Sequence, residues 1–394
     1  MDDMEYIKRN IEDILQDTLK RGKSVLLLGP RQTGKTTLLK RLKSDLYINL
    51  AMPDARQRYE KDASLLLGEI KSLKVNPAEE NLPLVLLDEI QKVPSILDAV
   101  QALIDEKKAR FVLTGSSARK LRRGTNINLL PGRLIGLKLD PITIAEFPGR
   151  LLEDILLYGS LPGIIEQETV HREADLESYV TLYLEEEVRA EAIVRNLGLF
   201  ARFLEYAAAE SGKLINFRKL SNEIGVAHTT IASYFQILED CLIIERIEPI
   251  TASATRKKLI QTQKFLFFDL GVRRTAAREG PKLPRATMGF LFEQFIGIEL
   301  IRNARFHGMK TKVRFWRDPN GPEVDWVIEK DDMFIPIEVK LTDAPSKSDT
   351  RHLTTFIEEY KNAPKGYIVC QTPRQITLTD KISAIPWQDL QMLF

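Results

Sequence analysis

The sequence has few of the residues that build metal centres or disulfide frameworks. Its 394 residues include only two cysteines and four histidines. Cys241 and Cys370 lie far apart, each in an apolar run typical of a buried structural thiol, so a disulfide framework and a cysteine-rich zinc site are excluded. No histidine has a partner at metal-ligand spacing. Neither residue type is therefore assigned a functional role.

Long apolar runs and an excess of one charge are also missing. No stretch approaches the roughly 20 apolar residues that a membrane span requires. The amino-terminal segment has the pattern of an acidic amphipathic helix rather than of a signal peptide. We therefore expect a cytoplasmic protein with no membrane contact. The formal net charge is only +2, so any basic surface for nucleic acid must be local.

The order of apolar and helical segments predicts an α/β protein with several domains. Residues 1–150 alternate near-continuous aliphatic strands with helices, which is typical of a parallel sheet covered on both faces. Residues 151–210 are expected to form a helical lid or connector. In residues 211–262, two short helices around Gly225 and a following strand pair indicate a winged helix. Residues 263–394 alternate strands and helices again and form the last predicted domain.

A phosphate-binding loop is predicted at residues 29–36, where GPRQTGKT follows the strand SVLLL and continues into a helix. Backbone N–H groups of such a loop, with the helix N-terminus behind them, bind phosphate oxygens. Lys35 is expected to reach the β- and γ-phosphates, and the Thr36 hydroxyl to bind Mg²⁺. The predicted nucleotide-binding residues of this segment are Gly29, Pro30, Arg31, Gln32, Thr33, Gly34, Lys35, Thr36 and Thr37.

A second acidic motif follows about fifty residues later, where LVLLDEIQ places two acids after four aliphatic residues. Asp88 at the strand end is expected to hold the magnesium shell, and Glu89 to polarise an attacking water. A glutamate beside the metal-binding aspartate favours hydrolysis over phosphorylation of a small molecule. The sequence therefore predicts an ATPase that uses ATP and Mg²⁺.

Two further residues are candidates for contact with the nucleotide. Ser116 lies at the end of the strand in FVLTGSSARKL, where a γ-phosphate sensor would sit, although a serine that caps the next helix is an equal alternative. Arg133 in LPGR could contact phosphate within its own chain or from a neighbouring subunit, and an ordinary surface arginine is the alternative.

Five motifs in this order give the chain a family resemblance: LLLGPRQTGKTTLL, LLDEIQKVP, FVLTGSSARKL, LPGRLIGLKLDPITIAEF and YGSLPG. The chain closely resembles a prokaryotic family of AAA+-like ATPases that join an ATPase module to a C-terminal domain of the DUF4143 type. The resemblance implies a winged helix in the middle and a C-terminal part similar to PD-(D/E)XK nucleases. Its residue matches are Gly29, Gly34, Lys35 and Thr36 for the phosphate loop, Asp88 and Glu89 for the acidic motif, and Ser116 and Arg133 for sensor and arginine finger.

A second group of charged residues falls in the C-terminal part. In the predicted strand FIPIEVK, Glu338 and Lys340 share one face, and Ile335, Ile337 and Val339 on the other face are directed into a core. Asp325 lies on the preceding strand and Glu293 in an upstream helix. The resemblance to PD-(D/E)XK enzymes implies that the three acids hold Mg²⁺ and that Lys340 positions a water. Charged alternation on an exposed strand is the alternative.

Residues 301–317 are rich in cations and contain no acid. Phe306, Phe315 and Trp316 are interleaved with these cations, and this combination suits phosphate contact and base stacking. A sheet edge protected by basic residues is an equal alternative. The predicted nucleic-acid-binding residues are Arg302, Arg305, Lys310, Lys312, Arg314 and Arg317.

Together these features predict an ATP-driven machine that acts on nucleic acid, with DNA favoured, and that assembles as a homo-oligomer. Its AAA+-like part would regulate a Mg²⁺-dependent nuclease-like domain. One alternative is a non-cleaving ATP switch that binds DNA or protein through the winged helix, whose second helix contains no lysine or arginine. Another is a defence or toxin-type effector in which the nucleotide controls assembly.

Overall fold

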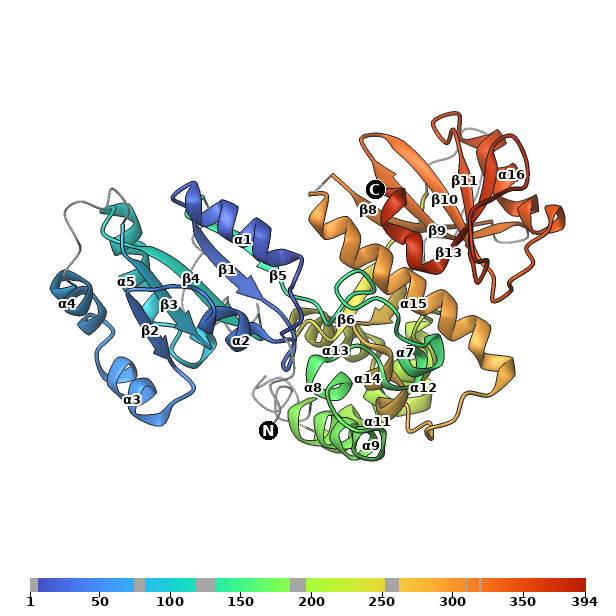
Figure 1. Cartoon of the computed structure of the whole chain (residues 1–394). Helices are drawn as coiled ribbons and strands as arrows, with labels where there is room; N and C mark the ends of the chain where they lie inside the picture. The colour runs from blue at the N-terminus through green and yellow to red at the C-terminus, as the bar shows by residue number, and fades with distance from the viewer. Residues whose placement is uncertain are drawn as a thin grey trace. The chain divides into compact units, whose positions relative to one another are not determined.

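The computed structural model describes residues 6–73, 82–117, 132–184, 196–251, 262–308, 310–318 and 321–394. The chain divides into two compact units (Figure 1). One unit comprises Met1–Pro141 with Asp240–Ile243, and the other comprises Ile142–Glu239 with Ile244–Phe394. The predicted connector and C-terminal domain therefore fall in the second unit, and so does the predicted winged helix except for Asp240–Ile243.

The first unit contains a five-stranded sheet in which every described pairing is parallel. Its strand order is β2-β3-β4-β1-β5. Each of these strands matches an aliphatic run of the sequence, so the predicted α/β fold with a parallel sheet is confirmed. The strands are β1 (Ser24–Leu28), β2 (Leu46–Asn49), β3 (Leu84–Asp88), β4 (Arg110–Gly115) and β5 (Leu134–Lys138).

Helices connect β1 to β2, β2 to β3 and β3 to β4, as parallel pairing requires. The described helices are α1 (Ile11–Lys20), α2 (Lys35–Lys40), α3 (Pro53–Lys61), α4 (Leu65–Ser72), the 3₁₀ turn η1 (Ile90–Lys92) and α5 (Ile96–Asp105). The apolar faces of α4 and α5 pack on strand residues such as Val85, Leu87 and Phe111. This core holds the ends of β1, β3 and β4 side by side, and the predicted motifs follow these ends.

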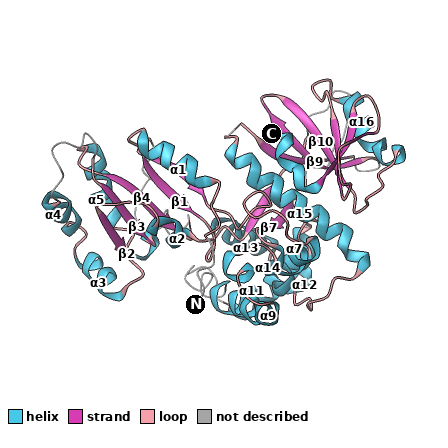
Figure 2. Cartoon of the chain, viewed as in Figure 1, coloured by secondary structure: helices cyan, strands magenta, loops and turns pink. Residues whose placement is uncertain are grey.

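The second unit begins with helices (Figure 2). They are α7 (Leu152–Tyr158), α8 (Pro162–Ile165), α9 (Thr169–Ser178), the π-helical η2 (Tyr179–Leu184), α11 (Leu197–Ala209), α12 (Phe217–Ile224) and α13 (His228–Asp240). Strands β6 (Ile244–Ile247) and β7 (Lys264–Phe267) form an antiparallel pair. Within residues 211–262, where a winged helix was predicted, the structure has α12, α13 and β6, but the partner of β6 is β7, which lies beyond that range. The winged helix stays a prediction.

A mixed six-stranded sheet forms the remainder of this unit, with the order β12-β13-β11-β10-β9-β8. Its strands are β8 (Lys312–Arg317), β9 (Glu323–Lys330), β10 (Met333–Val339), β11 (Gly366–Cys370), β12 (Ile376–Thr377) and β13 (Ile382–Pro386). The accompanying helices are α14 (Leu270–Ala276), α15 (Arg285–Phe306), the 3₁₀ turn η3 (Lys347–Thr350), α16 (Arg351–Glu359) and the 3₁₀ segment η4 (Trp387–Leu393).

Helix α15 packs closely on this sheet because Gly297 leaves room for the ring of Trp326. A Cβ atom at Gly297 would stand 2.4 Å from that ring. Residues of α15 share one apolar cluster with Trp326 and Ile337, whereas α16 shares another with Trp316 and Val327. The sheet is therefore covered on both faces, and Glu338 on the central strand β10 is only 4% exposed. The alternative of an exposed charged strand at this position is wrong.

None of the described helices combines the length and apolar character needed to span a lipid bilayer.

Candidate functional site

The predicted phosphate loop connects β1 to α2 at the carboxyl end of the parallel sheet. Gly34, the residue before α2, has φ of 93°, a conformation that glycine adopts without strain. The Lys35 ammonium is buried and donates hydrogen bonds to the carbonyls of Gly29 (2.8 Å) and Pro30 (2.7 Å). Lys35 therefore lies inside the curve of the loop, where a phosphate would replace the two carbonyls as its partner.

The phosphate loop packs against the backbone of the residues that follow β5. A Cβ atom at Gly29 would stand 2.4 Å from the carbonyl oxygen of Leu139, so only glycine fits there. The buried Arg9 donates to the carbonyls of Thr33 (2.8 Å) and Asp140 (2.6 Å). Sequence reasoning missed Arg9, because an arginine before an acidic helix carries no signal of its tertiary partners.

The other predicted loop residues lie along the same turn. Thr33 is buried, and its hydroxyl donates to the Pro30 carbonyl at 2.9 Å. Gln32 is exposed and has a left-handed φ of 60°. Arg31 is half-buried, and Thr37 is exposed on the first turn of α2.

The two acidic-motif residues lie where the sequence predicted, at the carboxyl end of β3. The Thr36 hydroxyl donates to Asp88 at 2.7 Å, and Tyr47 on β2 donates to the same oxygen at 3.2 Å. Thr114 on β4 donates to the other carboxylate oxygen of Asp88. Asp88 is fully buried, so the fold fixes one carboxylate beside the first hydroxyl of α2.

Glu89 follows in a left-handed conformation, with φ of 59°. Such a φ is unusual for a residue with a side chain. Its N–H donates to the Thr114 hydroxyl at 3.1 Å. The buried Gln91 amide donates to the Glu89 carboxylate and, at 3.0 Å, to the Ser116 hydroxyl. The structure thus connects Ser116 to Glu89, and Gln91 is the connecting residue that sequence reasoning missed.

Arg133 lies away from this group. It precedes β5, whose first residue, Leu134, pairs with Ser24 at the start of β1. Parallel strands rise about 3.3 Å per residue, so a distance on the order of 15 Å separates the two ends of β1. Arg133 pairs with Asp105 through contacts of 2.5 and 2.9 Å. The prediction that Arg133 contacts a nucleotide bound by its own chain is wrong, whereas contact from a neighbouring subunit stays a prediction.

The helix that Ser116 was expected to cap lies outside the described residues.

Thr36 and Asp88 fit a Mg²⁺ ion that accompanies a bound nucleotide. Hard cations prefer oxygen ligands, often one or two protein groups together with substrate phosphates. The hydroxyl and the carboxylate are 2.7 Å apart, so both oxygens can face one ion. When bound, such an ion neutralises charge on the phosphate oxygens.

The second predicted group assembles on three elements of the second unit. The last paired residues of β9 and β10 are Trp326 and Ile337. Asp325 is the neighbour of Trp326 on β9, and Glu338 is the neighbour of Ile337 on β10. Asp325 accepts the N–H of Val339 at 2.8 Å. Lys340 donates to Glu338 at 2.8 Å, and Glu338 has a second, buried oxygen with no hydrogen-bond partner.

Burial raises the proton affinity of all three acids, and the charge of Asp325 adds to this effect at both glutamates. Burial and then the charge of Asp325 raise the pKa of Glu293 on α15 to about 7. The same two causes raise the pKa of Glu338 to about 8. Burial also raises the pKa of Asp325. Three carboxyls with raised pKa values form the kind of electrostatic cluster that often marks a functional site.

A lysine that the sequence analysis missed completes this cluster. Lys264, the first residue of β7, is buried, and its ammonium lies 3.4 Å from a carboxylate oxygen of Glu293. As the acids stand, they do not fit a metal ion, since no group of three or more His, Cys, Asp or Glu in the described ranges is arranged to hold one. The predicted metal site at Glu293, Asp325 and Glu338 is therefore not formed in this structure.

The basic segment differs from its prediction in two ways. Arg302 is 3% exposed, pairs with Glu299 at 2.7 Å and donates to the carbonyl of Phe268, so its role is structural and its assignment to nucleic acid is wrong. Phe315 and Trp316 are buried in the core, so stacking of bases on these two rings is also wrong.

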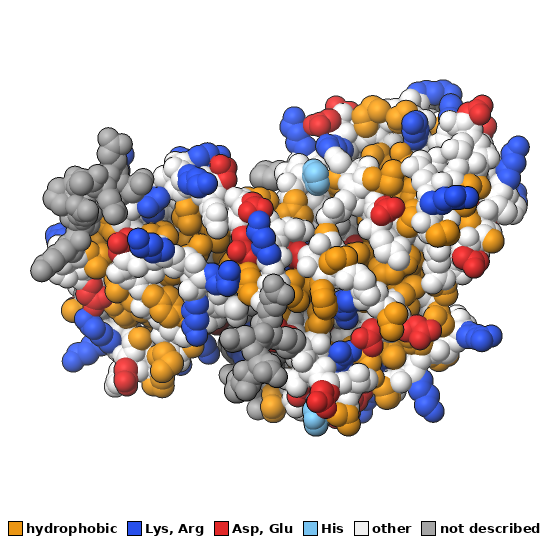
Figure 3. Space-filling model, viewed as in Figure 1, with side chains coloured by type: hydrophobic (Ala, Val, Ile, Leu, Met, Phe, Trp, Pro, Cys, Tyr) orange, Lys and Arg blue, Asp and Glu red, His pale blue; other side chains and the backbone are white. Residues whose placement is uncertain are grey.

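The other cations of the segment are partly engaged with acids. Arg305 pairs with Glu245 and Arg317 with Glu323. Arg314 pairs with both Glu248 and Glu329. Lys310 and Lys312 are exposed. Strand β8 is an edge of the sheet, and Figure 3 shows acidic side chains interspersed with basic ones over the visible face, so a protected sheet edge is favoured over a dedicated basic surface.

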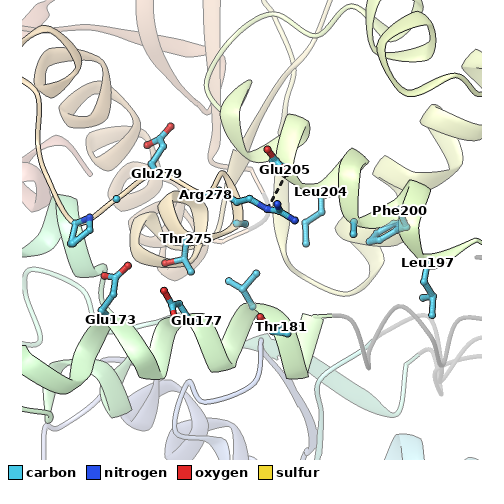
Figure 4. A pocket seen from close by; sticks show the side chains of 15 residues that line it. Glu173, Glu177, Thr181, Leu197, Phe200, Leu204, Glu205, Thr275, Arg278 and Glu279 are labelled. Atoms are coloured by element: carbon cyan, nitrogen blue, oxygen red, sulfur yellow. Dashed lines mark ion pairs between the residues drawn. The ribbon is translucent and has the colours of Figure 1, made fainter.

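A separate cavity of about 430 Å³ lies among α9, α11 and α14. Figure 4 shows glutamates around it, and one of them, Glu205, pairs with Arg278 at 3.1 Å. Glu173 and Glu279 pair with Arg274 and Arg273. Its acids are thus largely neutralised within the fold, and the cavity contains none of the predicted site residues.

Comparison with known families matches three segments of the chain. Residues 21–148 match a family described as an AAA domain. Residues 149–283 match a domain of unknown function, DUF8612, and residues 288–390 match another, DUF4143. The chain thus combines an AAA-type domain with a C-terminal DUF4143 domain, and the family resemblance predicted from its motifs is confirmed.

Two relatives match along most of this chain and most of their own length. An uncharacterised protein of Mycobacterium tuberculosis is 25% identical, over 96% of this chain and 83% of that protein. An uncharacterised protein of Methanocaldococcus jannaschii is 23% identical, over 99% of this chain and 89% of that protein.

Among solved structures, the chain is similar to a Bacillus subtilis DNA clamp loader delta protein, with 11% identity, coverage of 58% of this chain and 87% of that one, and a TM-score of 0.24. It is also similar to Drosophila ORC bound to AT-rich DNA, with 10% identity, coverage of 68% and 89%, and a TM-score of 0.26. Likeness at this level carries no conclusion about function.

Proposed function

We propose that this chain is an ATP-hydrolysing switch whose AAA-type domain controls a nuclease-like C-terminal domain that acts on nucleic acid. The observation that carries the ATPase part is the hydrogen bond between Thr36 and Asp88. It joins the phosphate loop to the acidic strand, and Glu89 follows at the strand end. Thr36 and Asp88 would hold a magnesium ion, and Glu89 would orient and polarise the attacking water.

Two variants test this part. Lys35→Ala should weaken nucleotide binding, because the ammonium supplies positive charge to the phosphates. Glu89→Gln should still bind ATP but hydrolyse it slowly, because only the water-polarising carboxylate is lost. Binding is measured by fluorescence of a labelled nucleotide, and turnover by phosphate release. Normal turnover by Glu89→Gln would remove Glu89 from this role.

Control of the second unit is supported by the segment that follows β5. In the first unit, Arg9 ties the carbonyl of Asp140 to the phosphate loop. In the second unit, the Ile142 carbonyl accepts from Arg302 at 3.3 Å, and the Ile144 N–H donates to Glu299 at 3.1 Å. Both of these partners lie on α15, the helix that also carries Glu293. Movement of the phosphate loop would therefore act on a short segment tied to the helix of the carboxyl cluster.

The nuclease-like part is supported by the side-by-side positions of Asp325, Glu338 and Lys340 on β9 and at the end of β10. We expect wild-type protein with ATP and Mg²⁺ or Mn²⁺ to nick labelled DNA, tested as single-stranded, duplex and branched substrates beside RNA, and to nick less without ATP. Asp325→Ala and Lys340→Ala should abolish nicking but leave ATP hydrolysis intact, because the phosphate loop belongs to the other unit.

A non-cleaving ATP switch is the second candidate. It is favoured by the position of Lys264 beside the carboxyls and by the acids already paired with Arg305, Arg314 and Arg317. The predicted winged helix at residues 211–262 would then supply the partner surface. Tight DNA binding without cleavage in either metal would support this candidate over the first.

Assembly as a homo-oligomer belongs to the same proposal, with Arg133 completing the site of a neighbouring subunit. Its ion pair with Asp105 would have to open for this contact. Mass photometry with a non-hydrolysable ATP analogue should show a larger assembly than without nucleotide. A monomer that keeps its full hydrolysis rate on dilution would exclude the contact.

A further inference from the structure

The ammonium of Lys264 occupies an unusual position for a lysine. Lys264 is 9% exposed, and its nitrogen lies 5.0 Å from the ring centre of Phe315 and 5.4 Å from that of Trp326. Cations are attracted to the faces of aromatic rings, more strongly when water is excluded. The third neighbour is the carboxylate of Glu293 at 3.4 Å. Two rings and one acid therefore fix this charge inside the fold.

The carboxylates near Lys264 are largely buried, and a nearby positive charge stabilises their ionised form. Asp325 and Glu338 are next to the paired residues Trp326 and Ile337 on neighbouring strands, and the charge of Asp325 disfavours ionisation of both Glu338 and Glu293. Glu338 is 4% exposed and has one oxygen without a hydrogen-bond partner. Such a buried, unpartnered oxygen is costly unless a proton or a cation reaches it. Lys340 forms an ion pair with the other oxygen of Glu338. Lys264 forms the corresponding ion pair with Glu293.

The geometry points to Lys264 as a built-in substitute for a divalent metal. We propose that its ammonium acts as the counter-ion of Glu293 and Asp325 and keeps metal out of the carboxyl cluster while β7 holds its present position. A divalent ion on the same acids would stand close to a second positive charge in a poorly hydrated site, where like charges repel strongly. This inference rests on the nuclease-like site proposed above and adds a mechanism that keeps it inactive.

The fold also supplies a way to release this block. Lys264 belongs to the two-stranded β6–β7 sheet, whereas Asp325 and Glu338 belong to the six-stranded sheet. A shift of the small sheet would withdraw the ammonium and leave the strands of the acids intact. The winged-helix-like part would then act as the regulator of the carboxyl cluster.

Mn²⁺ binding to the full-length protein without nucleotide tests the inference, with free Mn²⁺ measured by electron paramagnetic resonance. All variants carry Asp88→Asn, so that the nucleotide-site carboxylate does not contribute. Lys264→Met keeps the length of the side chain and removes its charge, and it should raise Mn²⁺ affinity about tenfold or more. Lys264→Gln serves as a second variant if Lys264→Met does not fold. Lys213→Met is the matched control, because Lys213 also pairs with a glutamate near a phenyl ring but is exposed.

Three outcomes are distinguishable. Gain of binding in Lys264→Met, lost again when Glu338→Gln is added, would support the inference. Equal binding by Lys264→Met and its parent, with loss in Glu338→Gln alone, would overturn the role of Lys264 but retain the metal site. Absence of binding in all variants would overturn both the inference and the metal-dependent nuclease proposal.

Discussion

Thr36 and Asp88 are 52 positions apart in the sequence and are joined by a hydrogen bond of 2.7 Å. Thr36 lies on α2, which follows β1, and Asp88 is the last residue of β3. Strands β1 and β3 are not neighbours, because β4 lies between them. The side chains meet because all three strands point the same way and end at one edge of the sheet. Thr114 on β4 donates to the same carboxylate. This strand order therefore turns two separate motifs into one site.

Thr36→Val should lose affinity for magnesium–ATP by about tenfold or more, because the variant keeps the shape of the side chain but cannot offer an oxygen to the ion. Thr36→Ser retains the hydroxyl and should bind like the wild type. ATP is titrated into each protein in a calorimeter, once in a buffer with Mg²⁺ and once in a buffer with EDTA. Equal loss in both media would contradict a role through the ion.

Gly29→Ala should destabilise the first unit by about 1–3 kcal/mol, because its Cβ would stand 2.4 Å from the Leu139 carbonyl. Nucleotide affinity should fall as well, since the loop must move to relieve this contact. Gly68→Ala on α4 is the control, because a Cβ at Gly68 meets nothing within 4 Å. Urea unfolding of both variants measures the difference, and an unaffected Gly29→Ala protein would show that the loop yields easily.

Arg302→Met should cost about 3–5 kcal/mol of stability, because it leaves Glu299 buried without its charged partner. Lys312→Gln, at an exposed position of β8, should change stability by less than about 0.5 kcal/mol. If β8 binds DNA, Lys312→Gln should reduce the salt dependence of binding by about one phosphate contact. A reduced salt dependence in folded Arg302→Met protein would reverse the structural assignment of Arg302.

These residues show how far sequence reasoning reaches. The phosphate loop and the acidic strand were predictable because each motif lies within one strand and its following turn, and local patterns determine such units. Residues 301–317 were misjudged because they pass from α15 into β8, and composition does not tell which of their side chains face the core. Arg9, Gln91 and Lys264 gave no signal, because their roles depend on partners brought near by tertiary packing.

The carboxyl cluster should make stability depend on pH. The pKa values of Glu293 and Glu338 rise from an ordinary 4.5 to about 7 and about 8 in the folded chain. A raised pKa means that the folded state holds its proton more tightly than the unfolded state. Stability from this source is fully present below about pH 4.5 and is lost as pH rises through 7 and 8, by at most about 1.4 kcal/mol per pH unit for each group.

Glu338→Gln imitates the protonated side chain and should therefore be less sensitive to pH between 5 and 9. At pH 9 it should be more stable than the wild type, because the wild type then carries a further negative charge beside Asp325, and Lys340 pairs with one oxygen of that carboxylate while the other has no hydrogen-bond partner. Urea unfolding at each pH, in EDTA, gives the free energies. Glu358→Gln, at an exposed position of α16, is the control and should follow the wild type. If the difference between Glu338→Gln and wild type were the same at pH 5 and pH 9, Glu338 would be ionised throughout, and its unpartnered oxygen would need another cation nearby.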